Sequence, residues 1–305
     1  MRRTPRWCST VVALALRAVA WGAGDSVDAT LSWPERGGPV YRETLVGHGQ
    51  LVRHLPGGDR TVALDADAGD LRRWQFKGDE PGGVRLTARS SAGHAVLRLA
   101  EGGLVFEREG PWRGFRFLVD ARGAMLESEV LESAATDSPD AAEPPVDLDL
   151  GEVFTALELG LLPPRAVNVG DTWHLPPESP ATEAPATEAP AMGPPPPMTV
   201  TGCLLGVEGS GTERTALYET HLEVTLAPRA TPLAGLAVRG TARLTARHRF
   251  ALGAGRTEEA RGPMTLALHY GYADARGAVA DVTLDLDVAA RRVDEDTLGP
   301  EPPAR

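Results

Sequence analysis

The chain has 305 residues, and 42% of them are hydrophobic, a share too high for a protein that is disordered throughout. Acidic residues outnumber basic ones by 42 to 31, so the surface repels phosphate backbones at neutral pH. We therefore expect no nucleic-acid partner, and the length allows one large domain or two ordinary ones.

The first residues (1–22) have the pattern of a signal peptide. Three arginines precede an apolar run from Cys8 to Ala20, which ends in Ala18-Val19-Ala20, the small-x-small sequence that signal peptidases recognise. The run is shorter than the roughly 20 apolar residues of a membrane-spanning helix, and an uncleaved anchor is the alternative. We expect an exported protein that is periplasmic or extracellular.

An N-terminal β part is predicted over residues 23–132. Turn signals there recur about every ten to fifteen residues, and the runs between them alternate apolar and polar positions, as antiparallel strands joined by hairpins do. The predicted strands are Val40 to Leu55, Arg60 to Asp65, Leu71 to Phe76, Val84 to Arg89, His94 to Ala100, Leu104 to Arg108, Phe115 to Asp120 and Ala124 to Val130.

The middle of the chain contains one predicted helix between two segments without core-forming residues. An acidic, proline-bearing linker covers residues 133–146, and a helix and turn follow over 147–175. Asp149 is suited to cap this helix, and one apolar face is formed by Leu150, Val153, Phe154, Leu157 and Leu161. Residues 176–198 repeat Ala-Thr-Glu-Ala-Pro and then contain four successive prolines, which predicts a disordered insertion acting as a spacer or as a proline-recognition ligand.

A C-terminal β part of the same barrel is predicted over residues 199–293, with a disordered tail over 294–305. Its apolar positions are even-numbered in all four runs, from Tyr218 to Leu226, Leu236 to Leu252, Met264 to Tyr272 and Val282 to Val288. The odd-numbered positions carry charges of both signs, such as Glu219, Glu223, Arg243 and Arg247. Because side chains alternate between the two faces of a strand, one face of this sheet is apolar and the other faces water.

The segment from Pro163 to Trp173 ends in Val-Gly-Asp-Thr-Trp and, together with the leader, the long hairpins and the single helix, is similar to exported bacterial proteins with the lipoprotein-carrier (LolA-like) half-barrel. This resemblance implies a mainly β fold: an antiparallel sheet curved into an incomplete barrel around one amphipathic helix, with an apolar cavity for acyl chains. From the residues alone, Gly170-Asp171 predicts a tight turn, Thr172 a strand, and Trp173 a plug for one end of the barrel.

Motifs for metal binding and catalysis are not matched. The seven histidines lack the close spacing of a zinc site. The acidic run from Asp65 to Asp70 resembles a calcium loop but lacks the glutamate at the twelfth position. No serine has the glycine pattern of a hydrolase elbow. We therefore expect a non-catalytic protein without a cofactor or a bound metal.

The predicted function is to hold a hydrophobic ligand, a lipid or the acyl chains of a lipoprotein, between sheet and helix in a monomeric protein. The predicted ligand-binding lining is Phe154, Leu157, Leu244, His248, Phe250, Leu266, Leu268, Tyr270 and Leu284. His248 lies on the apolar face and is either a hydrogen-bonded core histidine or an anchor for a ligand headgroup.

Two other functions compete with the carrier. The first is an envelope structural or protein-interaction module whose core is simply filled. The second is an enzyme whose site assembles from residues far apart in the sequence, such as His248 and a distant carboxylate.

Overall fold

The computed structural model describes residues 26–33, 38–91, 93–109, 114–131, 151–175, 198–230, 236–272 and 278–294. The predicted signal peptide and acidic linker lie outside these residues, as do the predicted insertion up to residue 197 and the tail from residue 295. Met198, the last residue assigned to the insertion, is instead the first residue of a strand. Within the described ranges, no helix is both long and apolar enough to span a bilayer.

The described residues form thirteen strands and one α-helix. The strands are β1 (Val40–Arg53), β2 (Arg60–Glu80), β3 (Gly83–Ser90), β4 (His94–Leu99), β5 (Leu104–Glu109), β6 (Gly114–Val119), β7 (Met125–Leu131), β8 (Thr172–Leu175), β9 (Met198–Glu208), β10 (Thr215–Ala230), β11 (Leu236–Ala251), β12 (Arg256–Tyr272) and β13 (Ala278–Val293). The helix is α1 (Gly151–Leu159), and a single 3-10 turn, η1 (Gly211–Glu213), precedes β10.

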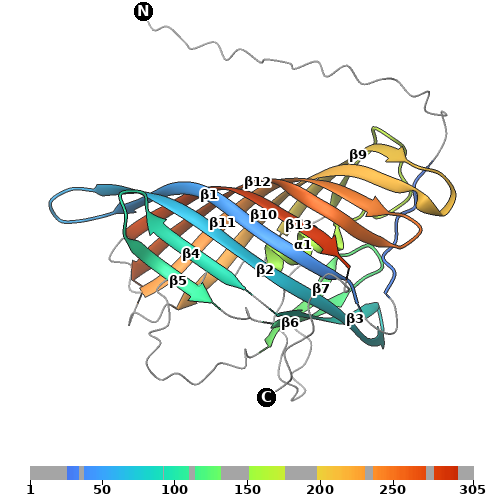
Figure 1. The fold of residues 1–305 in the computed structure, drawn as a ribbon, viewed down its shortest axis with the longest axis horizontal. Helices are drawn as coiled ribbons and strands as arrows, with labels where there is room; N and C mark the ends of the chain where they lie inside the picture. Colours follow the sequence, from blue (N-terminus) through green and yellow to red (C-terminus); the bar gives the residue numbers. More distant parts are fainter. Residues whose placement is uncertain are drawn as a thin grey trace, which may run out of the picture.

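All strands belong to one antiparallel sheet, with the order β7-β6-β3-β2-β1-β13-β12-β11-β10-β9-β8 and the β4–β5 hairpin attached to β2. The first and last long strands, β1 and β13, pair along their whole length and so join the two β parts of the chain. Strands β7 and β8 lie at the two ends of this order, β5 is the outer strand of the attached hairpin, and the sheet does not close. Figure 1 shows the long strands curving over α1, which confirms the predicted incomplete barrel around one helix.

Two predicted strands, Arg60 to Asp65 and Leu71 to Phe76, are wrong as separate elements because both belong to the continuous β2. The acidic run from Asp65 to Asp70 therefore lies within a strand and not in a loop. Its alternation explains this: Leu64 and Ala66 are buried while Asp65 and Asp67 are exposed, the pattern of a one-sided strand. Different parts of β2 pair with β4 and β3, so the sheet divides there.

The predicted parity of the C-terminal strands is confirmed. On β10, β11, β12 and β13 the even-numbered apolar side chains are buried along most of each strand. On the outer face, Arg243 Nη2 lies 3.1 Å from Glu223 Oε1, and Arg247 Nε lies 3.0 Å from Glu219 Oε2. Tyr272 has the same parity but is 48% exposed at the end of β12.

Glycines on the inner face let the sheet bend tightly. Gly47 and Gly49 occupy inward positions of β1, and a Cβ at either would overlap the backbone of β13, at the carbonyl oxygens of Asp285 and Thr283. A side chain at these positions would push β1 away from β13. Glycine in a strand interior commonly marks such a close approach and the curvature that goes with it.

Helix α1 lies inside the curved sheet. Every residue from Val153 to Leu159 is buried, so these residues leave no face of the helix open to water. Its apolar side chains pack on the sheet, whereas its polar side chains Thr155 and Glu158 are also buried, against β2. The helix ends at Leu159 and is followed by Gly160, whose φ of +80° suits glycine. Any Cβ there would overlap the Tyr218 hydroxyl, so the helix end fits closely against β10.

Residues 26–33 form a strap across one end of the barrel. Val27 forms a bridge with Val167, just before β8, and Leu31 N donates a hydrogen bond of 2.9 Å to Ala121 O in the β6–β7 turn. Ser32 N donates to Gly255 O, at 2.8 Å, in the β11–β12 turn. We call this the strapped end of the barrel and the opposite end, where β1 stops and β13 begins, the distal end.

Candidate functional site

The candidate site is the barrel interior, where strand register aligns the inward positions in rows. One row runs across five strands through Leu51, Val282, Leu268, Gly240 and Leu226 near the distal end. A second row, toward the strapped end, contains Glu43, Ala290, Ala260, His248 and Tyr218. The interior therefore has apolar and polar levels, and each level is built by residues far apart in the sequence.

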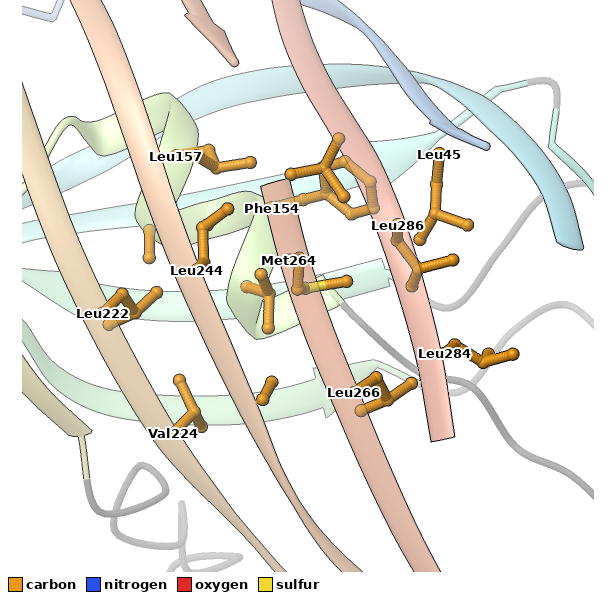
Figure 2. Packing of buried hydrophobic residues seen from close by; sticks show 14 of the residues in the cluster. Leu45, Phe154, Leu157, Leu222, Val224, Leu244, Met264, Leu266, Leu284 and Leu286 are labelled. Atoms are coloured by element: carbon orange, nitrogen blue, oxygen red, sulfur yellow. The ribbon is translucent and has the colours of Figure 1, made fainter. Parts of the chain in front are cut away.

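Seven of the nine predicted lining residues lie in one core cluster, whose members share nearly complete burial: Phe154, Leu157, Leu244, Leu266, Leu268, Tyr270 and Leu284. Figure 2 shows Phe154 beside Leu286, and Leu157 near Leu244. In the same view Leu266 and Leu284 lie further along the strands, away from the helix. The helix thus covers only part of the apolar face that the seven residues share.

The other two predicted lining residues, His248 and Phe250, lie toward the strapped end. Phe250 belongs to a separate cluster that includes Trp173 and Tyr218. Trp173 is buried there, its Nε1 donates to Leu161 O at 3.3 Å, and the Gly170-Asp171 turn precedes it, as predicted. The structure therefore does not bring Phe250 together with the predicted lining residues Leu268 and Leu284.

His248 has the environment of a core histidine. It is 2% exposed, its Nε2 lies 2.8 Å from Thr220 Oγ1, and its ring stacks on Tyr218 with a centroid separation of 4.7 Å. Burial lowers the pKa of His248 to about 3, and the nearby Leu157 backbone opposes part of this lowering. The imidazole is thus uncharged at neutral pH and packs beneath the helix.

A buried charged cluster that was not predicted from the sequence lies on the other side of the helix. Arg72 Nε lies 3.1 Å from Glu43 Oε1, and Arg72 Nη1 lies 4.0 Å from Glu158 Oε2. The Arg72 side chain is 2% exposed, and those of both glutamates are fully buried. Trp74 Nε1 donates a 2.6 Å hydrogen bond to Glu158 Oε2, and Arg72 Nη1 donates to Thr155 Oγ1 at 3.2 Å. These contacts tie α1 to β1 and β2.

The charged cluster contains one cation and several carboxyl groups. Burial raises the pKa of Glu43 well above its ordinary value, with Arg72 opposing the effect, and burial also raises the pKa of Glu158. The nearby Glu158 carboxylate raises the pKa of Glu43 further, which favours the protonated form of Glu43.

We call Glu43, Arg72, Glu158, His248 and Tyr218 together the polar layer. Between its two halves the sheet presents Ala260 and Ala290, both fully buried, and α1 lies against β12 and β13 at this level. Small side chains at these two positions leave room for the helix. The layer therefore sets the position of α1 by polar contacts on one side and close packing on the other.

The distal end is different, because its inward side chains are apolar and incompletely covered. Leu51, Leu226, Val238 and Ala280 are half-buried there and pack against the core cluster. Tyr270 lies among them, paired in register with Ala280 and Val238, and is 6% exposed. This end of the interior has apolar surface that a ligand could cover.

Strand parity was the one sequence signal that could have found the polar layer. On β1, Tyr41, Glu43 and Leu45 alternate inward, and on β2, Arg72 has the same parity as Leu64 and Trp74. That alternation places Glu43 on the inner face of β1 and Arg72 on the inner face of β2. It could not show that the two charges meet or that Glu158 of the helix joins them, since both depend on register between distant segments.

Within the described part of the chain, no three His, Cys, Asp or Glu side chains are grouped so that they could hold a metal ion. His54 Nε2 and His269 Nδ1 both contact Asp281 on the outer face, at 3.0 and 2.8 Å. Asp281 has a lowered pKa, with desolvation opposing the hydrogen bonds from the two histidines. This trio is a surface charge network.

Comparison with known proteins identifies no family. No protein-family model matches the chain, and no curated protein matches it significantly. Among solved structures, the chain is similar at 10% identity to DynF from the dynemicin biosynthesis pathway of Micromonospora chersina. The alignment covers 91% of this chain and 90% of that one with a TM-score of 0.24, which is too low to support an argument about fold or function.

Proposed function

We propose that the protein is a non-catalytic carrier that binds a hydrophobic ligand, a lipid or the acyl part of a lipoprotein, between sheet and helix. The observation that carries this proposal is the apolar inner face, which continues past α1 to the distal end and is only half-buried there. The leader sequence supports an exported site of action, and the chain is proposed to act as a monomer.

The energetics favour an apolar ligand at the distal end. Covering apolar surface contributes roughly 25 cal/mol for each Å² removed from water. Leu51, Leu226 and Val238 retain part of their surface for such contact, whereas Phe154 and Leu157 have almost none left to offer. The ligand is therefore proposed to lie beyond the helix and to extend the core that the helix begins.

The test is native mass spectrometry of the full chain, purified from the periplasm or medium of the cells that make it, followed by solvent extraction. The supporting result is a released acyl lipid, together with uptake of a fluorescent fatty-acyl probe by the delipidated protein. Val238→Asp should weaken probe uptake, because a charge then faces the ligand. The matched control is Leu205→Asp, which changes a side chain that is 48% exposed on β9. A purified protein that contains no ligand and takes up no probe would contradict the proposed carrier function.

A second candidate is an envelope structural or interaction module with a filled core. The observation that favours it is the burial of the predicted lining, since all nine residues are at most 6% exposed. Such a module takes up no acyl probe, and the envelope protein it contacts should be recovered by cross-linking in intact cells. Probe uptake that is lost in Val238→Asp and kept in Leu205→Asp contradicts this candidate.

A further inference from the structure

Two arginines lie next to each other at inner-face positions of the distal end. Arg53 is the last residue of β1 and Arg60 is the first residue of β2, and the strand register pairs them directly. Each has the parity of the buried residues on its strand, Leu45 on β1 and Leu64 on β2. Both arginines therefore belong to the face of the sheet that forms the apolar interior, at a level where they are exposed to water.

The row of register partners that contains these arginines crosses the distal end to a third arginine. From Arg53 it continues through Ala280 on β13, Tyr270 on β12 and Val238 on β11 to Arg229 on β10. The next row toward the helix is apolar and consists of Val62, Leu51, Val282, Leu268, Gly240 and Leu226. Neither of these two rows contains an acidic residue. A molecule with a hydrocarbon chain and an anionic head matches the two rows in succession.

The carboxylates closest to the two arginines along β2 and β13 are engaged by a histidine. Asp59 directly precedes Arg60, and its Oδ1 lies 3.0 Å from His54 Nδ1. Asp281, on the outer face, has its Oδ2 3.0 Å from His54 Nε2. Within the part of the chain that the structure describes, neither Arg53 nor Arg60 forms an ion pair. The positive charge on the inner face is therefore not cancelled by these two carboxylates.

The direct pairing of Arg53 with Arg60 favours an anion between them. Side chains directly opposite on antiparallel strands have Cβ atoms roughly 5 Å apart, and like charges at such positions destabilise the sheet. An anion that contacts both guanidinium groups removes this repulsion, and each guanidinium can donate two parallel hydrogen bonds to one oxyanion. A phosphate has enough oxygen atoms to accept hydrogen bonds from both. Because acidic residues outnumber basic ones by 42 to 31 in the whole chain, the attraction for an anion is local to this site.

We propose that Arg53 and Arg60 bind the phosphate headgroup of an acyl lipid, whose hydrocarbon chain lies along Leu51, Leu268 and Leu226. The inference rests on the proposed carrier function and specifies its ligand class: lipids with a phosphate headgroup, in preference to uncharged acyl lipids and to inorganic phosphate. Arg53 and Arg60 are then the specificity-determining residues of the site.

The test uses two fluorescent probes with the same acyl chain, a lysophosphatidic acid and the corresponding uncharged monoacylglycerol. Binding to the delipidated full-length protein is titrated at pH 7.5, where the phosphate is ionised. We expect the phosphate probe to bind more tightly than the monoacylglycerol. The double substitution Arg53→Gln/Arg60→Gln should weaken binding of the phosphate probe by about 10- to 100-fold, the value of a hydrogen bond to a charged group, and leave monoacylglycerol binding nearly unchanged.

The matched control is Arg239→Gln/Arg261→Gln. It removes the same total charge from exposed positions on the outer face of β11 and β12. This variant should bind the phosphate probe as the wild type does. Salt gives an independent readout, because raising the NaCl concentration from about 50 to about 500 mM should weaken binding of the phosphate probe to the wild type and leave monoacylglycerol binding nearly unchanged.

The outcomes separate the two levels of the proposal. Failure of the wild type to bind either probe overturns the carrier function itself. Equal binding of the two probes to the wild type, or unchanged binding of the phosphate probe to Arg53→Gln/Arg60→Gln, overturns the role of the arginines and leaves the carrier standing. An equal loss in both double variants does the same, since it shows an effect of overall charge.

Two further measurements test the ligand class and the premise. Inorganic phosphate alone should displace the phosphate probe only at a large excess; displacement at equal concentrations shows a site for the free anion and overturns the lipid headgroup. Thermal unfolding of ligand-free Arg53→Gln/Arg60→Gln should show equal or higher stability, because a like-charged pair is removed. A clear loss of stability would show that the arginines already have partners within the chain and would overturn the proposal.

Discussion

The buried imidazole of His248 predicts that acid destabilises the protein through one identifiable group. The ring stacks on Tyr218 and lies beneath the helix, and its pKa is lowered to about 3 by burial. In the unfolded chain the same group titrates near its ordinary value of 6.5. Between these two pH values the unfolded chain binds more protons, so stability falls as the pH falls from 6.5 toward 3.

The size of the effect follows from the gap between the two pKa values of His248. At about 1.4 kcal/mol per pKa unit, the gap between 6.5 and about 3 corresponds to about 5 kcal/mol in full. At pH 4.5 the free energy of unfolding should be lower than at pH 7 by about 3 kcal/mol because of His248. This is a large part of the 5–15 kcal/mol that typically separates folded from unfolded domains.

The assay is urea unfolding, followed by circular dichroism, of wild type and His248→Gln at pH values from 7.5 to 4.5. Glutamine stays uncharged over this range and can still hydrogen-bond to Thr220. The difference in unfolding free energy between the two proteins isolates His248 from the other titrating groups. The advantage of wild type over the variant should shrink by about 3 kcal/mol between pH 7 and pH 4.5.

The control is His221→Gln, because His221 is exposed on the outer face of β10. Its unfolding free energy should follow that of wild type at every pH. Parallel curves for wild type and His248→Gln down to pH 4.5 would refute the reasoning, since they would mean that the imidazole is hydrated or charged in the folded protein.

Three further substitutions test the interior by chemical unfolding. Glu43→Gln should match wild type in stability near pH 4 and be more stable at pH 8, because the raised pKa of Glu43 gives stability that is present below its ordinary value and lost as pH rises; equal pH profiles would contradict the raised pKa. Phe154→Ala should cost about 3–5 kcal/mol through the cavity it leaves, and a cost below about 1 kcal/mol would mean that the helix is loosely packed. Gly160→Ala should cost about 1–3 kcal/mol, from its positive φ and from overlap with the Tyr218 hydroxyl, whereas Gly57→Ala, in open space, is the control.

The strand pattern was predictable where one physical rule dominates. On β12 and β13 each even-numbered residue is apolar, from Met264 to Tyr270 and from Val282 to Val288, and burial of one face requires that alternation. The acidic run from Asp65 to Asp70 was misjudged as a break because aspartate and glycine are common in turns. In β2 the alternating Leu64 and Ala66 on the buried face outweighed that local preference.

The candidate site was predictable only in part, for a related reason. Parity places Leu268, Tyr270 and Leu284 on the inner face, and all three lie in the same core cluster. Phe250 lies in another cluster. Which cluster it joins depends on where the helix ends along the barrel, and the apolar–polar alternation of the strands does not encode that position. The contacts of Arg72 with Glu43 and with Glu158 depend on strand register and helix placement together.

The polar layer also explains why a single short helix takes one position within so large an apolar interior. A uniform apolar face would allow α1 to slide along the strands at little cost, because hydrophobic contact is non-directional. Sliding would separate Glu158 from Trp74 and Arg72 and leave buried charges unpaired, at a cost of several kcal/mol. The buried ion pairs need not add net stability to have this effect, since they penalise every other position. By holding α1 near the strapped end, they keep the apolar row at Leu51 and Leu226 available for the ligand we propose.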